Sequence, residues 1–139
     1  MLTGSCQCGE VRFEADGPVE DFSHCHCSIC RRVHGAPYVS WGGVPKAGFR
    51  YLYGEELLTR YASSDDIDRY FCSRCGSHLL CDFKAEPHML YLALGVVEGG
   101  PDLPQGYHFF MNFKAPWVRI NDGLPQYPEW PPGEGSWKD

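Results

Sequence analysis

The sequence predicts an all-β fold, mainly β with little helix. Several short segments alternate apolar and polar residues, which is typical of half-buried strands. Sixteen glycines and eleven prolines divide the chain at short intervals. No window shows a sustained apolar period of about 3.6 residues, as an amphipathic helix would. Seven of the eight cysteines are clustered, so tight metal-binding turns are expected to stabilise these short strands.

The expected strands follow one another along the chain. In the first, Val11, Phe13 and Ala15 alternate with Arg12 and Glu14, a period of two that predicts one buried face. The further predicted strands are Tyr38–Trp41, Arg50–Tyr53, Leu57–Tyr61, Arg69–Phe71, His78–Phe83 and Met89–Val97.

Helix is expected at one place, since Ser28–His34 could form a helical turn or two. The chain of 139 residues is predicted to be a single domain, 1–139, with a core at about 3–130. The tail from Leu124 is too rich in proline for regular structure, and it is expected to fray after about Trp130.

The composition limits the classes of molecule that this protein is expected to bind. The formal net charge is -6, and seven ionised thiolates with two zinc ions would make it three charges more negative. Such a surface argues against nucleic acid, which needs a basic patch. No apolar run reaches the length of about 20 residues that a membrane helix needs, and the first residues lack the pattern of a signal peptide. A cytoplasmic protein with reduced thiols is therefore expected.

The three cysteine clusters are Cys6-Gln7-Cys8, Cys25-His26-Cys27-Ser28-Ile29-Cys30 and Cys72-Ser73-Arg74-Cys75. The third cluster, followed by Gly76, is a zinc-knuckle signature: both sulfurs can aim at one ion, and glycine permits the tight turn. The first cluster, followed by Gly9, is a shorter version of this device. Each knuckle supplies two ligands, so we pair the two knuckles in one four-sulfur site.

The remaining three cysteines, Cys25, Cys27 and Cys30, lie within six residues and can wrap around a second ion. This second site would keep an open coordination position, which is where a catalytic metal binds its substrate. The alternative partition gives one knuckle two of these three sulfurs. Purely structural metal sites, an iron–sulfur cluster and disulfides also remain open.

Other residues near the clusters have less specific signals. His24 or His26 could fill the fourth position of the three-sulfur site, although neighbours of ligands on a tight loop usually point away. Cys81 is expected to be a small buried hydrophobe. The isolated histidines are expected in core or surface roles: His78, His88 and His108.

The ordered clusters resemble a known family. The matching segments are Gly4–Phe13, Cys25–Arg31, Phe71–Gly76, Lys114–Trp117 and Asp122–Pro125. Together they resemble the glutathione-dependent formaldehyde-activating enzymes, a family that includes centromere protein V. The resemblance implies a β-rich fold around two zinc ions, a structural one held by the first and last clusters and a second held by the middle cluster.

The family's reaction joins glutathione and formaldehyde into S-hydroxymethylglutathione and is classed with carbon–sulfur lyases. The resemblance thus implies Cys25, Cys27 and Cys30 as catalytic metal ligands, and a small-molecule thiol and aldehyde as partners. Beside them Arg31 or Arg32 could pair with a glutathione carboxylate, or each could be a solvated surface charge. The alternative function is a non-catalytic zinc-stabilised binding or structural domain.

Overall fold

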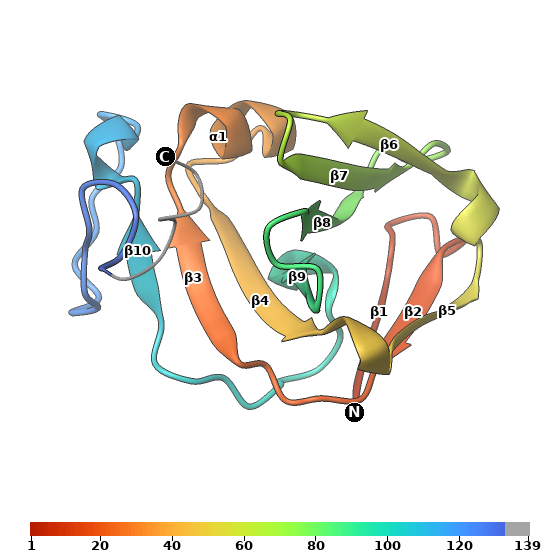
Figure 1. Ribbon diagram of the computed structural model, residues 1–139. Coiled ribbons are helices and arrows are strands. Elements are labelled where there is room, and N and C mark those ends of the chain that lie inside the picture. Colours follow the sequence, from red (N-terminus) through yellow and green to blue (C-terminus); the bar gives the residue numbers. More distant parts are fainter. Residues whose placement is uncertain (133–139) are drawn as a thin grey trace.

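Short alternating segments pair into two sheets in the computed structural model, which describes residues 1–132 (Figure 1). The smaller sheet is antiparallel, with strand order β1-β2-β5. Its strands are β1 (Leu2–Ser5), β2 (Arg12–Ala15) and β5 (Phe49–Tyr53). The predicted all-β class is therefore confirmed.

The larger sheet has seven strands in the order β10-β3-β4-β9-β8-β7-β6. Its strands are β3 (Asp21–Cys25), β4 (Val39–Pro45), β6 (Leu58–Ala62), β7 (Ile67–Cys72), β8 (His78–Phe83), β9 (Met89–Ala93) and β10 (Tyr107–Phe109). All neighbours in this sheet are antiparallel except β10 and β3, which run parallel. The larger sheet therefore pairs segments that lie between residues 21 and 109 of the chain.

The described part of the chain contains one α-helix, α1 (Ser28–His34), which matches the predicted segment. Cys27 caps its start, since the Cys27 sulfur accepts the amide N–H of Cys30 at 3.2 Å. Gly35 ends it in the left-handed conformation, with φ of 59°. The short 3-10 helices are η1 (Lys46–Gly48), η2 (Glu55–Leu57), η3 (Leu94–Val96) and η4 (Met111–Phe113).

Two apolar cores hold the sheets together. Val11, Phe13 and Ala15 are fully buried, so the predicted alternation of the first strand places one face in the first core. This core lies between the smaller sheet and the larger sheet, and it includes Cys6 and Cys72. The second core surrounds the middle cysteine cluster and is built largely from residues of β3, β4, β9 and β10. Each cysteine-bearing turn thus borders an apolar core.

The structure departs from the predicted strands in one long segment. The strand predicted over Met89–Val97 ends at Ala93, where η3 turns the chain away from the larger sheet. This turn brings Val97 to the smaller sheet, where it forms an isolated bridge with Gly4. The apolar residues continue beyond β9 because Val96 and Val97 pack against the first core.

The proline-rich tail is irregular but held in place up to the end of the described residues. The Trp130 ring lies 5.6 Å from the Phe109 ring and 4.7 Å from the Phe110 ring, centroid to centroid. Gln126 bridges His108 of β10. The sequence predicts fraying after about Trp130. This expectation concerns mainly residues 133–139, which lie outside the described residues. Within residues 1–132 no helix has the length and apolar character needed to cross a membrane.

Candidate metal centres

The four cysteines of the two knuckles meet at one point. Cys6 and Cys8 lie in the turn between β1 and β2, whereas Cys72 ends β7 and Cys75 follows it in the turn to β8. All four sulfur atoms lie within 4.8 Å of one another. Two of these separations are 3.5 Å (Cys6 to Cys8) and 3.9 Å (Cys8 to Cys72). Sulfurs bound tetrahedrally at about 2.3 Å would be separated by about 3.8 Å, so this donor set fits a four-coordinate ion.

The two knuckles share a backbone conformation that explains their sequence. Gly9 and Gly76 both have φ of 81°, in the left-handed region that side chains rarely adopt. The Gly9 amide donates to the Cys6 carbonyl at 3.1 Å, and the Gly76 amide donates to the Cys72 carbonyl at 2.8 Å. Each glycine therefore closes a turn that keeps two sulfurs on the same side.

The middle cluster forms a second group of sulfurs. Cys25 ends β3, Cys27 caps α1 and Cys30 lies in the first turn of α1, and their three sulfurs lie within 4.8 Å of one another. Within the described residues no fourth cysteine, histidine or carboxylate joins this group. Cys25 and Cys30 are buried, whereas Cys27 is partly exposed. The group can hold an ion with three sulfurs, which leaves one position of a tetrahedral ion for another ligand.

The three thiols are electrostatically coupled. Hydrogen bonds from the Cys25 and Cys30 thiols, with help from the Cys30 amide and the charge of Arg69, lower the pKa of Cys27. The pKa of Cys25 is raised well above its ordinary value, first by its hydrogen bond to Cys27 and also by burial. The surroundings thus favour one thiolate in this group before any ion binds, and an ion would release the other protons.

A buried arginine lies against this group. Arg69 of β7 is 4% exposed, and its Nη2 donates to the Cys30 sulfur at 3.5 Å. Its Nε donates to the Ser63 hydroxyl at 2.9 Å, and its guanidinium carbon lies 5.9 Å from the centre of a Trp41 ring. A permanent positive charge here offsets the negative charge of clustered thiolates. The local sequence gives no sign of this role for Arg69, because only strand pairing brings it to a cysteine thirty-nine positions away.

Two buried histidines connect the loop of the three-cysteine group to the C-terminal segment of the chain. His26 lies between two of the cysteines but outside both sulfur groups, and its Nε2 lies 2.8 Å from Nδ1 of His108. Nε2 of His108 lies 2.8 Å from a carboxylate oxygen of Asp122. Both imidazoles are fully buried. His26 therefore anchors the loop, and His108 has a structural partner on each side, in line with the expected core role.

Arg31 and Arg32, the residues considered for ligand binding, are placed differently. Arg31 is partly buried on α1, and its Nε is buried without a hydrogen-bond partner in the described part of the chain. Its charge also helps to lower the pKa of His26, after burial and the charges of His108 and other neighbours. Arg32 is exposed. The two arginines therefore differ in how far they are buried.

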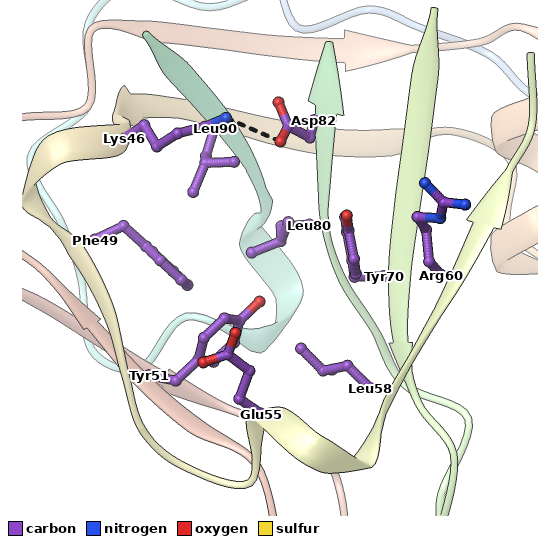
Figure 2. Close-up of a pocket in the computed structure, with 10 residues that line it drawn as sticks. All are labelled: Lys46, Phe49, Tyr51, Glu55, Leu58, Arg60, Tyr70, Leu80, Asp82 and Leu90. Atoms are coloured by element: carbon purple, nitrogen blue, oxygen red, sulfur yellow. Dashed lines mark hydrogen bonds and ion pairs between the residues drawn. The ribbon is translucent and has the colours of Figure 1, made fainter. Parts of the chain in front are cut away.

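A pocket of about 350 Å³ lies elsewhere, between β5 and the strands β7, β8 and β9 (Figure 2). Figure 2 shows the Lys46–Asp82 ion pair, 2.9 Å long, at one end of it. In the pairing of β7 with β8, Tyr70 lies opposite Leu80 and both line this pocket. Arg69 and its partner Cys81 alternate with them, so they face the other side of the sheet. The pocket is thus separate from the three-cysteine group.

Comparison with known proteins connects these sites to a family. The model of the family described as "Glutathione-dependent formaldehyde-activating enzyme" matches residues 1–112. A Halomonas elongata protein named "Putative glutathione-dependent formaldehyde-activating enzyme" is 31% identical over 127 residues, which cover 86% of this chain and 81% of that protein. An uncharacterized lyase of Schizosaccharomyces pombe is 30% identical over 76 residues, 55% of this chain and 53% of that protein.

A solved structure supports the fold. The crystal structure of a Rhodobacter sphaeroides protein superposes with a TM-score of 0.61 at 23% identity, covering 90% of this chain and 98% of that one. The matched family model spans all three cysteine clusters, from Cys6 to Cys75. On this evidence the chain belongs to the glutathione-dependent formaldehyde-activating enzyme family.

Proposed function

We propose that this protein is a zinc-dependent carbon–sulfur lyase-type enzyme that joins glutathione and formaldehyde into S-hydroxymethylglutathione, or runs the reverse reaction. The observation that carries the proposal is the group of Cys25, Cys27 and Cys30, to which the described chain adds no fourth donor. A metal held by three protein ligands keeps the position that a substrate needs. The four-cysteine group, by contrast, is complete and serves as the structural zinc site.

Zinc held by the three thiolates would bind the glutathione thiol in its remaining position and favour the deprotonated sulfur. The chain's own residues prepare this site. Cys25 and Cys30 are buried and fix the sulfurs on β3 and α1, whereas partly exposed Cys27 marks the side from which a thiol can approach. In the reaction the sulfur forms a bond to the aldehyde carbon, the π pair of the carbonyl moves to oxygen, and the thiol proton ends on that oxygen.

Arg31 is the proposed contact for a carboxylate of glutathione. It follows Cys30 directly on α1, and its side chain is partly exposed. A guanidinium can hold a carboxylate with two parallel hydrogen bonds, which would orient the peptide as its sulfur reaches the cysteine group. Closely spaced reduced thiols also suit the cytoplasm, where disulfides rarely persist.

The test is exchange NMR on glutathione and formaldehyde with the zinc-loaded protein. We expect faster exchange between free glutathione and its hydroxymethyl adduct than in buffer, and loss of this acceleration in Cys27→Ser. Zinc content measured on the same samples should fall from two ions to one in the variant. Unaccelerated exchange with two zinc ions bound would reject the enzyme and leave a zinc-stabilised binding domain.

A further inference from the structure

Four side chains form a compact group beside the three cysteines, which we call the arginine–histidine cluster: Arg69, Trp41, His34 and His78. The His34 ring lies edge-on to Trp41 at 5.5 Å and beside His78 at 5.0 Å, centroid to centroid. Arg69 lies over Trp41 and donates to the Cys30 sulfur. The cluster thus combines residues of α1, β4, β7 and β8 at the edge of the proposed active site.

Three polar atoms of this cluster have no partner. Arg69 Nη1, His34 Nε2 and His78 Nδ1 are each buried and without a hydrogen bond within residues 1–132. The positive charge of Arg69 acts on both imidazoles and, after burial, contributes to lowering the pKa values of His34 and His78. The imidazoles are therefore neutral near pH 7, and each has one N–H that can be placed on either nitrogen.

A buried guanidinium N–H without an acceptor is costly, because it has lost its hydrogen bonds to water and gained none in return. The other nitrogens of Arg69 are satisfied by Ser63 and Cys30, so Nη1 is the atom still free to bind an oxygen. Nη1 and Nη2 branch from the same carbon, so an acceptor on Nη1 would lie close to the Cys30 sulfur. Because these atoms are closed to solvent, the guest must be small.

We propose that Arg69 Nη1, together with the ring nitrogens of His34 and His78, binds the oxygen of the one-carbon aldehyde; this inference rests on the proposed function. The ligand class is a small carbonyl or carboxylate oxygen, because the three nitrogen atoms are buried although the two histidine residues are partly exposed. Arg69 thereby becomes a catalytic residue, and the two histidines complete the hydrogen bonds around the oxygen.

The arginine–histidine cluster would stabilise the negative charge that develops on the aldehyde oxygen. When the sulfur attacks, the S–C bond forms and the π pair of the carbonyl moves to oxygen. Arg69 Nη1 and an imidazole N–H donate to this oxygen until it takes up the proton that left the thiol. No electron donor or acceptor is needed. A preorganised donor to such an oxyanion typically contributes a factor of about 10² to 10³ in kcat.

The experiment compares zinc-loaded wild type with Arg69→Lys, His34→Phe and His78→Phe. Phenylalanine keeps the ring contacts but removes the nitrogens, so these two variants remain informative even where a change at buried Arg69 prevents folding. Arg60→Lys is the matched control, because Arg60 is exposed on the neighbouring strand β6. Exchange NMR measures kcat, calorimetry measures glutathione affinity without aldehyde, and formate, an unreactive one-carbon probe, is titrated by saturation-transfer NMR.

We expect kcat to fall at least tenfold in Arg69→Lys, His34→Phe and His78→Phe, with zinc content and glutathione affinity unchanged. Formate affinity should fall at least tenfold in the same variants and stay constant in Arg60→Lys. Unchanged kcat in all three variants overturns the proposal. Formate that binds equally to wild type and to the two histidine variants also overturns it, because formate would then be bound to the metal.

The two proposals can fail separately. Wild type that binds formate through the cluster but does not accelerate exchange would reject the proposed reaction and uphold the oxygen-binding site. Wild type that accelerates exchange, with formate failing to bind or binding unaffected by the substitutions, would uphold the reaction and reject the site.

Discussion

His26 and His108 are hydrogen-bonded ring to ring at 2.8 Å, although eighty-two positions separate them in the sequence. Asp122 accepts a hydrogen bond from Nε2 of His108, so Nδ1 of His108 is left to accept from Nε2 of His26. This chain of three residues runs from the C-terminal segment to the loop that carries the middle cysteines. It gives the loop a fixed orientation that no neighbouring residue in the sequence supplies.

Asp122→Ala tests the contribution of this chain. Removing the carboxylate leaves a buried N–H of His108 without its acceptor, so we expect the free energy of unfolding to fall. Urea denaturation of zinc-loaded protein measures it. Asp102→Ala, at an exposed aspartate in a loop, is the control. Equal stability of the two variants would show that the contact is energetically neutral.

Cys72→Ser tests the structural zinc site. Cys72 is fully buried in the first core and joins β7 to the turn between β1 and β2. Because a structural zinc can contribute about 10 kcal/mol or more, a domain of ordinary stability should not fold without it. We expect insoluble or unfolded protein by circular dichroism. Cys81→Ala, at a buried cysteine outside both groups, should keep the fold and two zinc ions. A soluble Cys72→Ser variant with an unchanged melting temperature would contradict this role.

The three-cysteine group should bind the more labile metal. With three protein ligands instead of four, it should lose zinc first when a chelator is added, while the circular dichroism spectrum stays unchanged. Cys30→Ser should lose one zinc ion and retain most of its thermal stability. Metal analysis at increasing chelator concentration separates the two sites. Simultaneous release of both ions together with unfolding would argue against a separate, open site.

Arg31→Ala should weaken glutathione binding by about 1–3 kcal/mol, the range for a charged hydrogen bond, without releasing zinc. Arg32→Ala is the matched control, since Arg32 is the next residue but is exposed. Calorimetric titration of both zinc-loaded variants measures the difference. Arg31 would be removed from the site if its variant bound glutathione as tightly as wild type does.

Burial of His34 predicts a pH dependence of stability. Burial, with smaller contributions from the charges of His78 and Arg69, lowers the pKa of His34 from 6.5 to about 4. Between these values the unfolded chain binds a proton that the folded protein does not, so the free energy of unfolding falls as the pH falls. From pH 7 to 5, wild type should lose about 1 kcal/mol more than His34→Phe, allowing for the partial exposure of the ring. Urea denaturation at both pH values measures this difference. Any loss of stability from zinc release is common to both proteins and therefore cancels. Equal losses would mean that His34 titrates normally in the folded state.

Local sequence predicted the turns and short elements well. The knuckles follow from spacing, because two sulfurs separated by one or two residues on a tight turn can face one ion, and Gly9 and Gly76 adopt the expected backbone. The helix Ser28–His34 and the strand His78–Phe83 have the predicted bounds. In contrast, the short strands β1, β3 and β10 were missed. Each is defined by its partner strand, and its own residues carry too weak a pattern.

The sequence by itself determined the three cysteine clusters, their glycines and the β-rich class, because these depend on residues a few positions apart. Tertiary structure decided which distant side chains surround the clusters. The pairing of β7 with β8 directs Arg69 and Cys81 to one face and Tyr70 to the other. That register brings Arg69 to Cys30, and the sheet also brings His78 beside His34. A shift of one residue would reverse these faces, and strand register is set by packing across the whole sheet.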